Sequence, residues 1–190
     1  MTIRFDDKVA IVTGAGGGIG KQHALELAKR GAKVVVNDLG GSVDGSGASD
    51  AAEEVVDLIK SDGGEAISNG ASVTDINAVK NMVQQTMDEW GRIDILVNNA
   101  GILRDKSFHK VTLEDFELVM DVHFQGTLNC THSVFPIMRE QEYGRIIFTS
   151  SSSGVFGNFG QTNYGSAKMA MIGLMNTLKL EGQNLSLIHI

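Results

Sequence analysis

Short apolar runs alternate along the chain with longer segments in which apolar residues recur every three or four positions. Four runs are rich in β-branched residues, at 9–12, 34–36, 93–97 and 145–148, and a weaker fifth lies at 65–68. Such runs are typical of strands buried on both faces. The longer segments predict amphipathic helices at 19–29, 50–61, 75–90, 113–140 and 164–181.

The alternation of strand and helix predicts the fold class. Strands buried on both faces and joined through helices form a parallel sheet that helices cover. Right-handed crossovers then give an α/β fold, a Rossmann-like doubly wound parallel sheet in three α/β/α layers.

Local signals refine this outline. Asp50 with Glu53, and Thr112 with Asp115, fit the pattern of a capped helix start. Pro136 is expected to kink or interrupt the segment 113–140. The Gly- and Ser-rich stretch 39–49 predicts a mobile loop after the second strand.

Composition limits the classes of function. The 190 residues suffice for one domain, and the net charge of -7 without a basic run argues against a nucleic-acid or anionic-membrane partner. No apolar run has the length of a membrane span or resembles a signal peptide. Cys130 is the single cysteine, so we expect a small buried side chain, no disulfide and a reducing, cytoplasmic location. The five histidines show no metal-binding spacing, so no metal site is expected.

The first candidate site is a glycine-rich turn between the first strand and the first helix. It reads TGAGGGIG from Thr13, and its expected cofactor-binding residues are Gly14, Gly16, Gly18, Ile19 and Gly20. Small residues let a backbone approach a pyrophosphate closely, and a helix N-terminus attracts its charge. A merely tight turn is the alternative, but the position between strand and helix favours a dinucleotide.

Asp38 ends the second strand, 18 residues beyond Gly20. A dinucleotide fold needs a carboxylate at about this place to accept hydrogen bonds from the adenosine ribose. The same carboxylate would repel a 2′-phosphate, so the sequence favours NAD over NADP. A turn-forming aspartate is the alternative.

The second candidate site lies where the fourth and fifth strands end, in Asn98-Asn99-Ala100-Gly101 and in Thr149-Ser150-Ser151. Open α/β sheets bind ligands at the carboxyl ends of their strands. Tyr164 and Lys168 follow one helical turn apart and share a helix face. An ammonium beside a phenol favours the phenolate, which can act as a base. The plainer alternative is a half-buried tyrosine beside a surface lysine.

Together these motifs resemble the short-chain dehydrogenase/reductase family over residues 8–182. The resemblance implies that Ser151, Tyr164 and Lys168 are catalytic: Tyr164 as acid/base, Lys168 as its partner on the nicotinamide ribose, Ser151 as a hydrogen-bond donor to the substrate oxygen. It implies that Asn98, Ala100, Gly101, Tyr164 and Lys168 contact the NAD cofactor, with Thr13 bracing the segment after the fourth strand. His123 stands where many relatives carry an asparagine of the proton relay, so we expect a relay role or a packed or surface histidine.

Finer details, such as NDLGG, AGILRDKSF and GVFGNFGQTNY, resemble the (3R)-hydroxyacyl-CoA dehydrogenase subgroup of peroxisomal multifunctional enzymes and their bacterial relatives. The implied reaction is NAD-dependent oxidation of a (3R)-3-hydroxyacyl-CoA. The alternatives are a steroid or general alcohol dehydrogenase, a 3-oxoacyl-[acyl-carrier-protein] reductase, and an NAD-sensing module without turnover. We expect Phe156, Asn158 and Phe159 to shape the substrate entrance, or else to pack a loop.

The resemblance also implies a homodimer or homotetramer. Its candidate contact residues are Phe116, Val119, Met120, Met169, Met171 and Met175, although such apolar stripes are more often core.

A relative would continue through two more strands, so we expect an incomplete domain at 1–184 with an uncovered sheet edge, and a peroxisomal location stays open. Residues 185–190 are read either as the start of a sixth strand or as a tail that is not native.

Overall fold

The computed structural model describes residues 3–46 and 49–182, and the sixth strand or tail considered at 185–190 lies outside them. The five expected strands are confirmed and form one parallel sheet in the order β3-β2-β1-β4-β5. They are β1 (Val9–Thr13), β2 (Lys33–Asn37), β3 (Ala66–Asn69), β4 (Ile95–Asn98) and β5 (Arg145–Phe148). Within the described ranges β5 pairs only with β4, so it is an edge strand.

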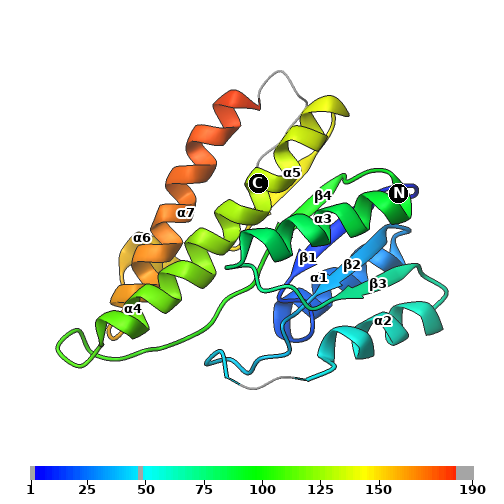
Figure 1. The fold of residues 1–190 in the computed structure, drawn as a ribbon. Coiled ribbons are helices and arrows are strands. Elements are labelled where there is room, and N and C mark those ends of the chain that lie inside the picture. Colours follow the sequence, from blue (N-terminus) through cyan, green and yellow to red (C-terminus); the bar gives the residue numbers. More distant parts are fainter. Residues whose placement is uncertain (1–2, 47–48, 183–190) are drawn as a thin grey trace.

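Helices cover both faces of the sheet (Figure 1), which confirms the three-layer fold. They are α1 (Gly18–Lys29), α2 (Ala51–Ser61), α3 (Ile76–Trp90), α4 (Leu113–Met120), α5 (Gly126–Glu140), α6 (Ser152–Phe156) and α7 (Thr162–Glu181). A five-residue π-helical turn, η1 (Asp121–Gln125), joins α4 to α5.

Alternate residues of each central strand point into two separate cores. Val12 and Val36 belong to the core beneath α1 and α2, whereas Ile11 and Val35 belong to the core beneath α3, α5 and α7. Cys130 is buried in the second core, as expected of a small apolar side chain. Both faces of the sheet are thus sealed, which leaves the strand ends to carry chemistry.

Helix α2 begins directly after Asp50, as expected, but the side chain of Asp50 makes no capping hydrogen bond, because the backbone of Asp50 is turned (ψ 25°) rather than extended. The expected interruption at Pro136 is wrong, because Pro136 lies inside α5, which runs unbroken from Gly126 to Glu140, at an exposed position. The interruption of the segment 113–140 is η1 instead. Thr112 does cap α4 by accepting a hydrogen bond from the Asp115 N–H group.

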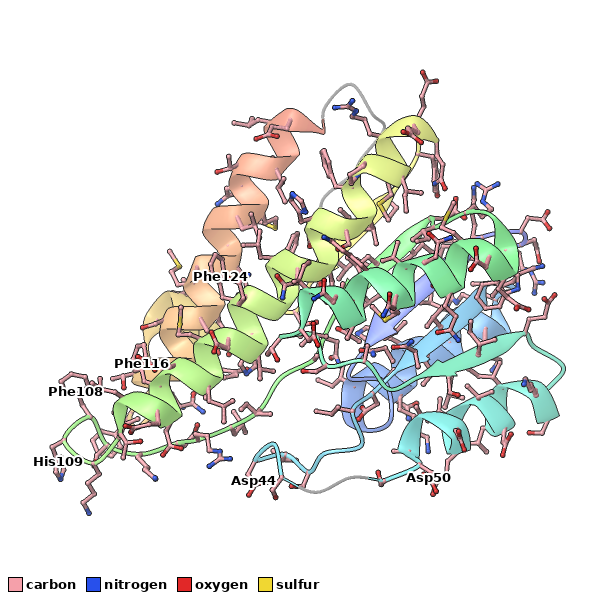
Figure 2. The ribbon with its side chains drawn as sticks, viewed as in Figure 1. Asp44, Asp50, Phe108, His109, Phe116 and Phe124 are labelled. Atoms are coloured by element: carbon pink, nitrogen blue, oxygen red, sulfur yellow. The ribbon has the colours of Figure 1, made fainter. Side chains whose placement is uncertain are left out.

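The expected subunit-contact stripe is only partly on the surface. Val119 and Met171 are core residues of this chain, so the expectation is wrong for them. Met169 is exposed. Phe108, on the loop before α4, is also exposed and projects away from the sheet (Figure 2).

Candidate active site

A cavity of about 590 Å3 lies at the carboxyl ends of the strands and joins the two candidate sites. The expected site residues that line it are Gly14, Gly18, Ile19, Asp38, Ala100, Gly101, Tyr164 and Lys168. Gly16, Gly20, Asn98 and Ser151 do not line it. The volume is in the range of small-molecule sites.

The turn before α1 can receive an anion. Gly17 is the N-cap of α1 and has no side chain to satisfy the first N–H groups of the helix. A Cβ atom added at Gly17 or Gly18 would meet nothing within 4 Å, and Gly18 has the left-handed φ of +51°. The helix end is therefore open to a phosphate group.

Other glycines bring this turn against the segment that follows β4. A Cβ atom on Gly14 (φ +63°) would stand 2.8 Å from the Ala100 Cα atom. On Gly20 it would stand 2.1 Å from the Gly14 carbonyl oxygen. Gly20 therefore serves close packing rather than contact with the cavity.

Thr13 braces the end of β4, as expected. Its Oγ1 atom accepts hydrogen bonds from the N–H groups of Asn99 (3.0 Å) and Ala100 (3.1 Å) and donates to the carbonyl group of Val97 (3.3 Å). Asn98 is buried, and its amide group donates to the Thr131 hydroxyl group (3.1 Å).

Asp38 is fixed at the edge of the cavity. Its Oδ2 atom accepts from the Gly16 N–H group (2.8 Å) and its Oδ1 atom from the Gly40 N–H group (2.7 Å). A carboxylate offers about four acceptor sites, so both oxygens can take further donors. Gly16 supports this acid, since a Cβ atom there would stand 2.9 Å from Oδ2.

Tyr164 and Lys168 meet as the one-turn spacing predicts. The Lys168 Nζ atom lies 5.4 Å from the centre of the Tyr164 ring, and it donates a hydrogen bond to the Thr149 carbonyl oxygen. Lys168 is only 3% exposed, and this burial lowers its pKa to about 8. The alternative of a surface lysine is therefore wrong.

Ser151 is the N-cap of α6, where its Oγ atom accepts from the Ser153 N–H group (3.2 Å). Helix α6 packs against α7. Two glycines that the sequence analysis missed allow this approach: a Cβ atom on Gly154 would stand 2.9 Å from the Met169 backbone nitrogen, and one on Gly165 would stand 2.9 Å from the Ser153 oxygen. Ser151 is thereby carried on a short helix that packs directly on the helix of Tyr164.

Several cavity residues carry no motif. Apolar side chains from separate segments line the part near Asp38 and the segment after β4, namely Leu39, Val43, Val73 and Ile102. The sequence signals strand ends but not which loop residues border the cavity, so these residues were not expected.

A rim segment, residues 102–106, hydrogen-bonds to the loop after β2 and to the start of α7. The Leu103 N–H group donates to the Val43 carbonyl oxygen (2.9 Å) in the loop after β2. The Arg104 carbonyl oxygen accepts from the Asn163 side chain (3.1 Å) at the start of α7. The loop near Asp38 and the helix that carries Tyr164 are thus held by the same short stretch of chain.

His123 is packed rather than at the surface, and it lines the cavity. Burial, and secondly the positive charge of Lys168, lower the pKa of His123 to about 4.

We expect His123 to make the protein sensitive to acid. The unfolded histidine binds a proton near pH 6.5, whereas the folded one does so near pH 4. Between these values the unfolded state binds more protons than the folded state. The free energy of unfolding therefore decreases as the pH is lowered from 6.5 to 4, by at most about 3 kcal/mol. Urea unfolding at stepwise pH should show this slope, and His123→Gln should flatten it. An equal slope in both proteins would contradict the expectation.

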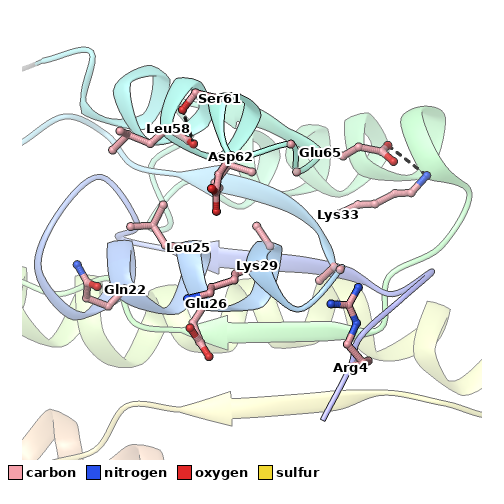
Figure 3. A pocket seen from close by; sticks show the side chains of 16 residues that line it. Arg4, Gln22, Leu25, Glu26, Lys29, Lys33, Leu58, Ser61, Asp62 and Glu65 are labelled. Atoms are coloured by element: carbon pink, nitrogen blue, oxygen red, sulfur yellow. Dashed lines mark hydrogen bonds and ion pairs between the residues drawn. The ribbon is translucent and has the colours of Figure 1, made fainter. Parts of the chain in front are cut away.

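A second hollow, of about 670 Å3, lies between α1 and α2 (Figure 3). It includes the ion pair of Lys33 with Glu65 (3.3 Å) and none of the expected site residues. Residues 3–46 and 49–182 contain no group of three or more His, Cys, Asp or Glu side chains that could hold a metal ion. Among the same residues, no helix is both long and apolar enough to cross a membrane.

Comparison with known proteins gives one family match. Residues 8–189 match the family model described as short chain dehydrogenase. The chain is 57% identical over 185 residues to peroxisomal multifunctional enzyme A of Dictyostelium discoideum, covering 97% of this chain and 41% of that protein. It is 53% identical over 181 residues to the peroxisomal hydratase-dehydrogenase-epimerase of Saccharomyces cerevisiae, covering 95% of this chain and 20% of that protein. The chain thus spans less than half the length of these relatives.

A solved structure agrees with the fold. It is a 7α-hydroxysteroid dehydrogenase complexed with NADH and 7-oxo glycochenodeoxycholic acid, 31% identical with a TM-score of 0.89. The match covers 98% of this chain and 69% of that one. That relative binds a nicotinamide cofactor.

Proposed function

Since this chain belongs to the short chain dehydrogenase family, we propose that it interconverts a secondary alcohol and a ketone with NAD as cofactor. The observation that carries the proposal is the buried Lys168 beside Tyr164 at a cavity that an open helix end and Asp38 also border. The open helix end and Asp38 both suit a dinucleotide. The turn before α1 would bind its pyrophosphate, and Asp38 its adenosine ribose.

Three residues of this chain would have distinct roles in the proposed reaction. Lys168 would hold the nicotinamide ribose, and its charge would favour the phenolate form of Tyr164. Tyr164 would take the hydroxyl proton in alcohol oxidation and return it in ketone reduction. Ser151 would donate a hydrogen bond to the substrate oxygen. The nicotinamide ring supplies the hydride chemistry at its C4 atom.

We propose a (3R)-3-hydroxyacyl-CoA as the substrate. The proposal is supported by the high identity to a peroxisomal multifunctional enzyme and to an enzyme named in part for dehydrogenase activity. The names of both relatives also favour a peroxisomal location over the cytoplasmic one expected from composition. A steroid alcohol is the second candidate, because the matched solved structure holds an oxidised bile acid.

The test is an assay of the purified chain, expressed together with any sequence that follows it in its gene. Reduction of NAD is measured with (3R)- and (3S)-3-hydroxyacyl-CoAs of several chain lengths and with a panel of steroid alcohols. We expect turnover of the (3R) thioesters. Turnover of steroids alone would replace the substrate proposal, and no turnover of any alcohol would overturn the proposed function. Size-exclusion chromatography of the same protein would test the proposed homodimer or homotetramer.

Asp38 is expected to decide between NAD and NADP. Asp38→Asn keeps the shape but removes the charge that opposes a 2′-phosphate. The preference for NAD, as the ratio of kcat/KM values, should fall roughly 10- to 100-fold, which corresponds to about 1.4–2.7 kcal/mol. The matched control is Asp57→Asn, an exposed aspartate of α2. An unchanged ratio in Asp38→Asn would show that another group discriminates.

A further inference from the structure

His123 is a buried titratable residue that the proposed reaction does not use. It lies in η1, the π-helical turn between α4 and α5. Such a turn contains one residue more than an α-helical turn and is frequent at functional sites. Because η1 packs against α7, the turn brings the His123 ring to the helix that carries Tyr164.

The ring is anchored through one nitrogen atom. The Nε2 atom of His123 lies 2.8 Å from the carbonyl oxygen of Ile102 and 3.1 Å from its backbone nitrogen. A neutral imidazole nitrogen either donates or accepts. With a proton, Nε2 donates to the oxygen; without one, it accepts from the N–H group. Ile102 therefore holds the ring in both tautomers. The Nδ1 atom has no hydrogen-bond partner among the described residues.

The anchored ring packs on Tyr164. The two ring centres are 5.1 Å apart and the planes are perpendicular, which is a favourable edge-to-face arrangement. The ring also fills the space beside Gly101, where an added Cβ atom would stand 2.3 Å from the His123 Cε1 atom. Gly101 thus makes room for His123.

The ring stays uncharged at neutral pH. The charged or titratable groups that face it are Lys168 and Tyr164 of α7, and burial together with the Lys168 charge keeps the pKa of His123 near 4. An imidazolium that passes protons is therefore disfavoured, and a role through packing is favoured. The Lys168 ammonium group is then left as the nearby cation that favours the phenolate.

On the basis of the proposed function, we propose that His123 is a positioning residue: anchored to Ile102, its neutral ring sets the orientation of the Tyr164 ring at the cavity. A small displacement of a reacting group can reduce a rate about 100-fold. Loss of the ring should therefore lower kcat more than it changes the KM for NAD.

Spectroscopy tests the anchor without substrate. In long-range 1H–15N spectra of the labelled chain without cofactor, His123 is expected to keep one protonated ring nitrogen from pH 8 to pH 5.5. In His123→Gln, the Tyr164 ring signals should shift, whereas those of Tyr143 should not. A His123 ring that becomes charged near pH 6.5, or Tyr164 signals that do not change, would overturn the proposal.

Kinetics test the consequence in the protein with NAD and its alcohol substrate. His123→Gln can still reach Ile102 but has no ring, and we expect kcat to fall 10- to 100-fold. His132→Gln, at an exposed position of α5, is the control and should keep the wild-type kcat. A kcat within twofold of wild type in His123→Gln would overturn the proposal. An inactive wild type would instead remove the proposed function, and the spectra would still decide on the anchor.

A double-mutant cycle separates ring placement from other effects. Gly101→Ala should displace the ring and lower kcat by a similar factor. In a His123→Ala background the space is empty, so Gly101→Ala should have little further effect. Circular dichroism confirms that each variant is folded. Equal losses in both backgrounds would show that the position of His123 is not what Gly101 protects.

Discussion

Tyr164→Phe is expected to reduce kcat for alcohol oxidation about 1,000-fold or more while leaving the affinity for NAD close to that of the wild type. The change removes one hydroxyl group, which is the only proton acceptor that the proposed reaction uses at the substrate. General acid–base groups contribute typically 100- to 10,000-fold. Steady-state kinetics measure kcat, and calorimetric titration with NAD measures the affinity.

The chain offers a matched control in its other tyrosine. Tyr143 also has cations beside its ring, with Lys8 Nζ at 4.0 Å and the Arg145 guanidinium carbon at 4.8 Å from the ring centre. It is absent from the lining of the cavity. Tyr143→Phe should therefore leave kcat unchanged. If Tyr164→Phe retains activity within threefold of the wild type, Tyr164 is not the acid/base.

Lys168→Met is expected to reduce kcat 100-fold or more without unfolding the protein. Methionine has a similar length but no charge, so it neither favours a phenolate nor binds a ribose. The lost hydrogen bond to the Thr149 oxygen costs about 1–3 kcal/mol. Removal of a buried ammonium group offsets that cost. Assays and thermal melts of the same preparations separate the two effects.

The pH dependence of stability provides a second measurement on Lys168. The unfolded lysine loses its proton near pH 10.5, whereas the folded one does so near pH 8. Between these values the unfolded state binds more protons, so the free energy of unfolding should rise with the pH. The rise should disappear in Lys168→Met and persist in Lys179→Met, whose lysine is exposed on the same helix. A rise that survives in Lys168→Met would assign it to another group.

Much of the fold could be predicted because its signals are local. Each buried strand is a short β-branched run, and Asp38 directly follows β2. Parallel strands bring such ends to one edge, so the sequence also predicts that Asp38 and Gly101 lie at the same edge of the sheet, whereas the place of Lys168 at the cofactor came from the family resemblance. The burial of Lys168 could not be predicted from the sequence, because it depends on how α7 lies against the sheet.

The features that could not be predicted involve small shifts of phase or close contacts between distant segments. A period of 3.6 residues continues through 113–140, and one π-helical turn changes it too little to be noticed in the sequence. Gly154 and Gly165 look like ordinary small residues until α6 meets α7. The place of His123 depends on both effects, which is why its role stayed open.

The rim segment has a consequence for exchange of parts between homologous enzymes. Residues 102–106 form hydrogen bonds on one side to the loop after β2 and on the other to the start of α7. A chimera that imports the rim segment alone must re-form its hydrogen bonds to both the recipient's loop and the recipient's α7, and one that imports only the loop or only the start of α7 must re-form its bond to the recipient's rim segment. Transplants intended to alter coenzyme or substrate choice should therefore move all three stretches as a single cassette.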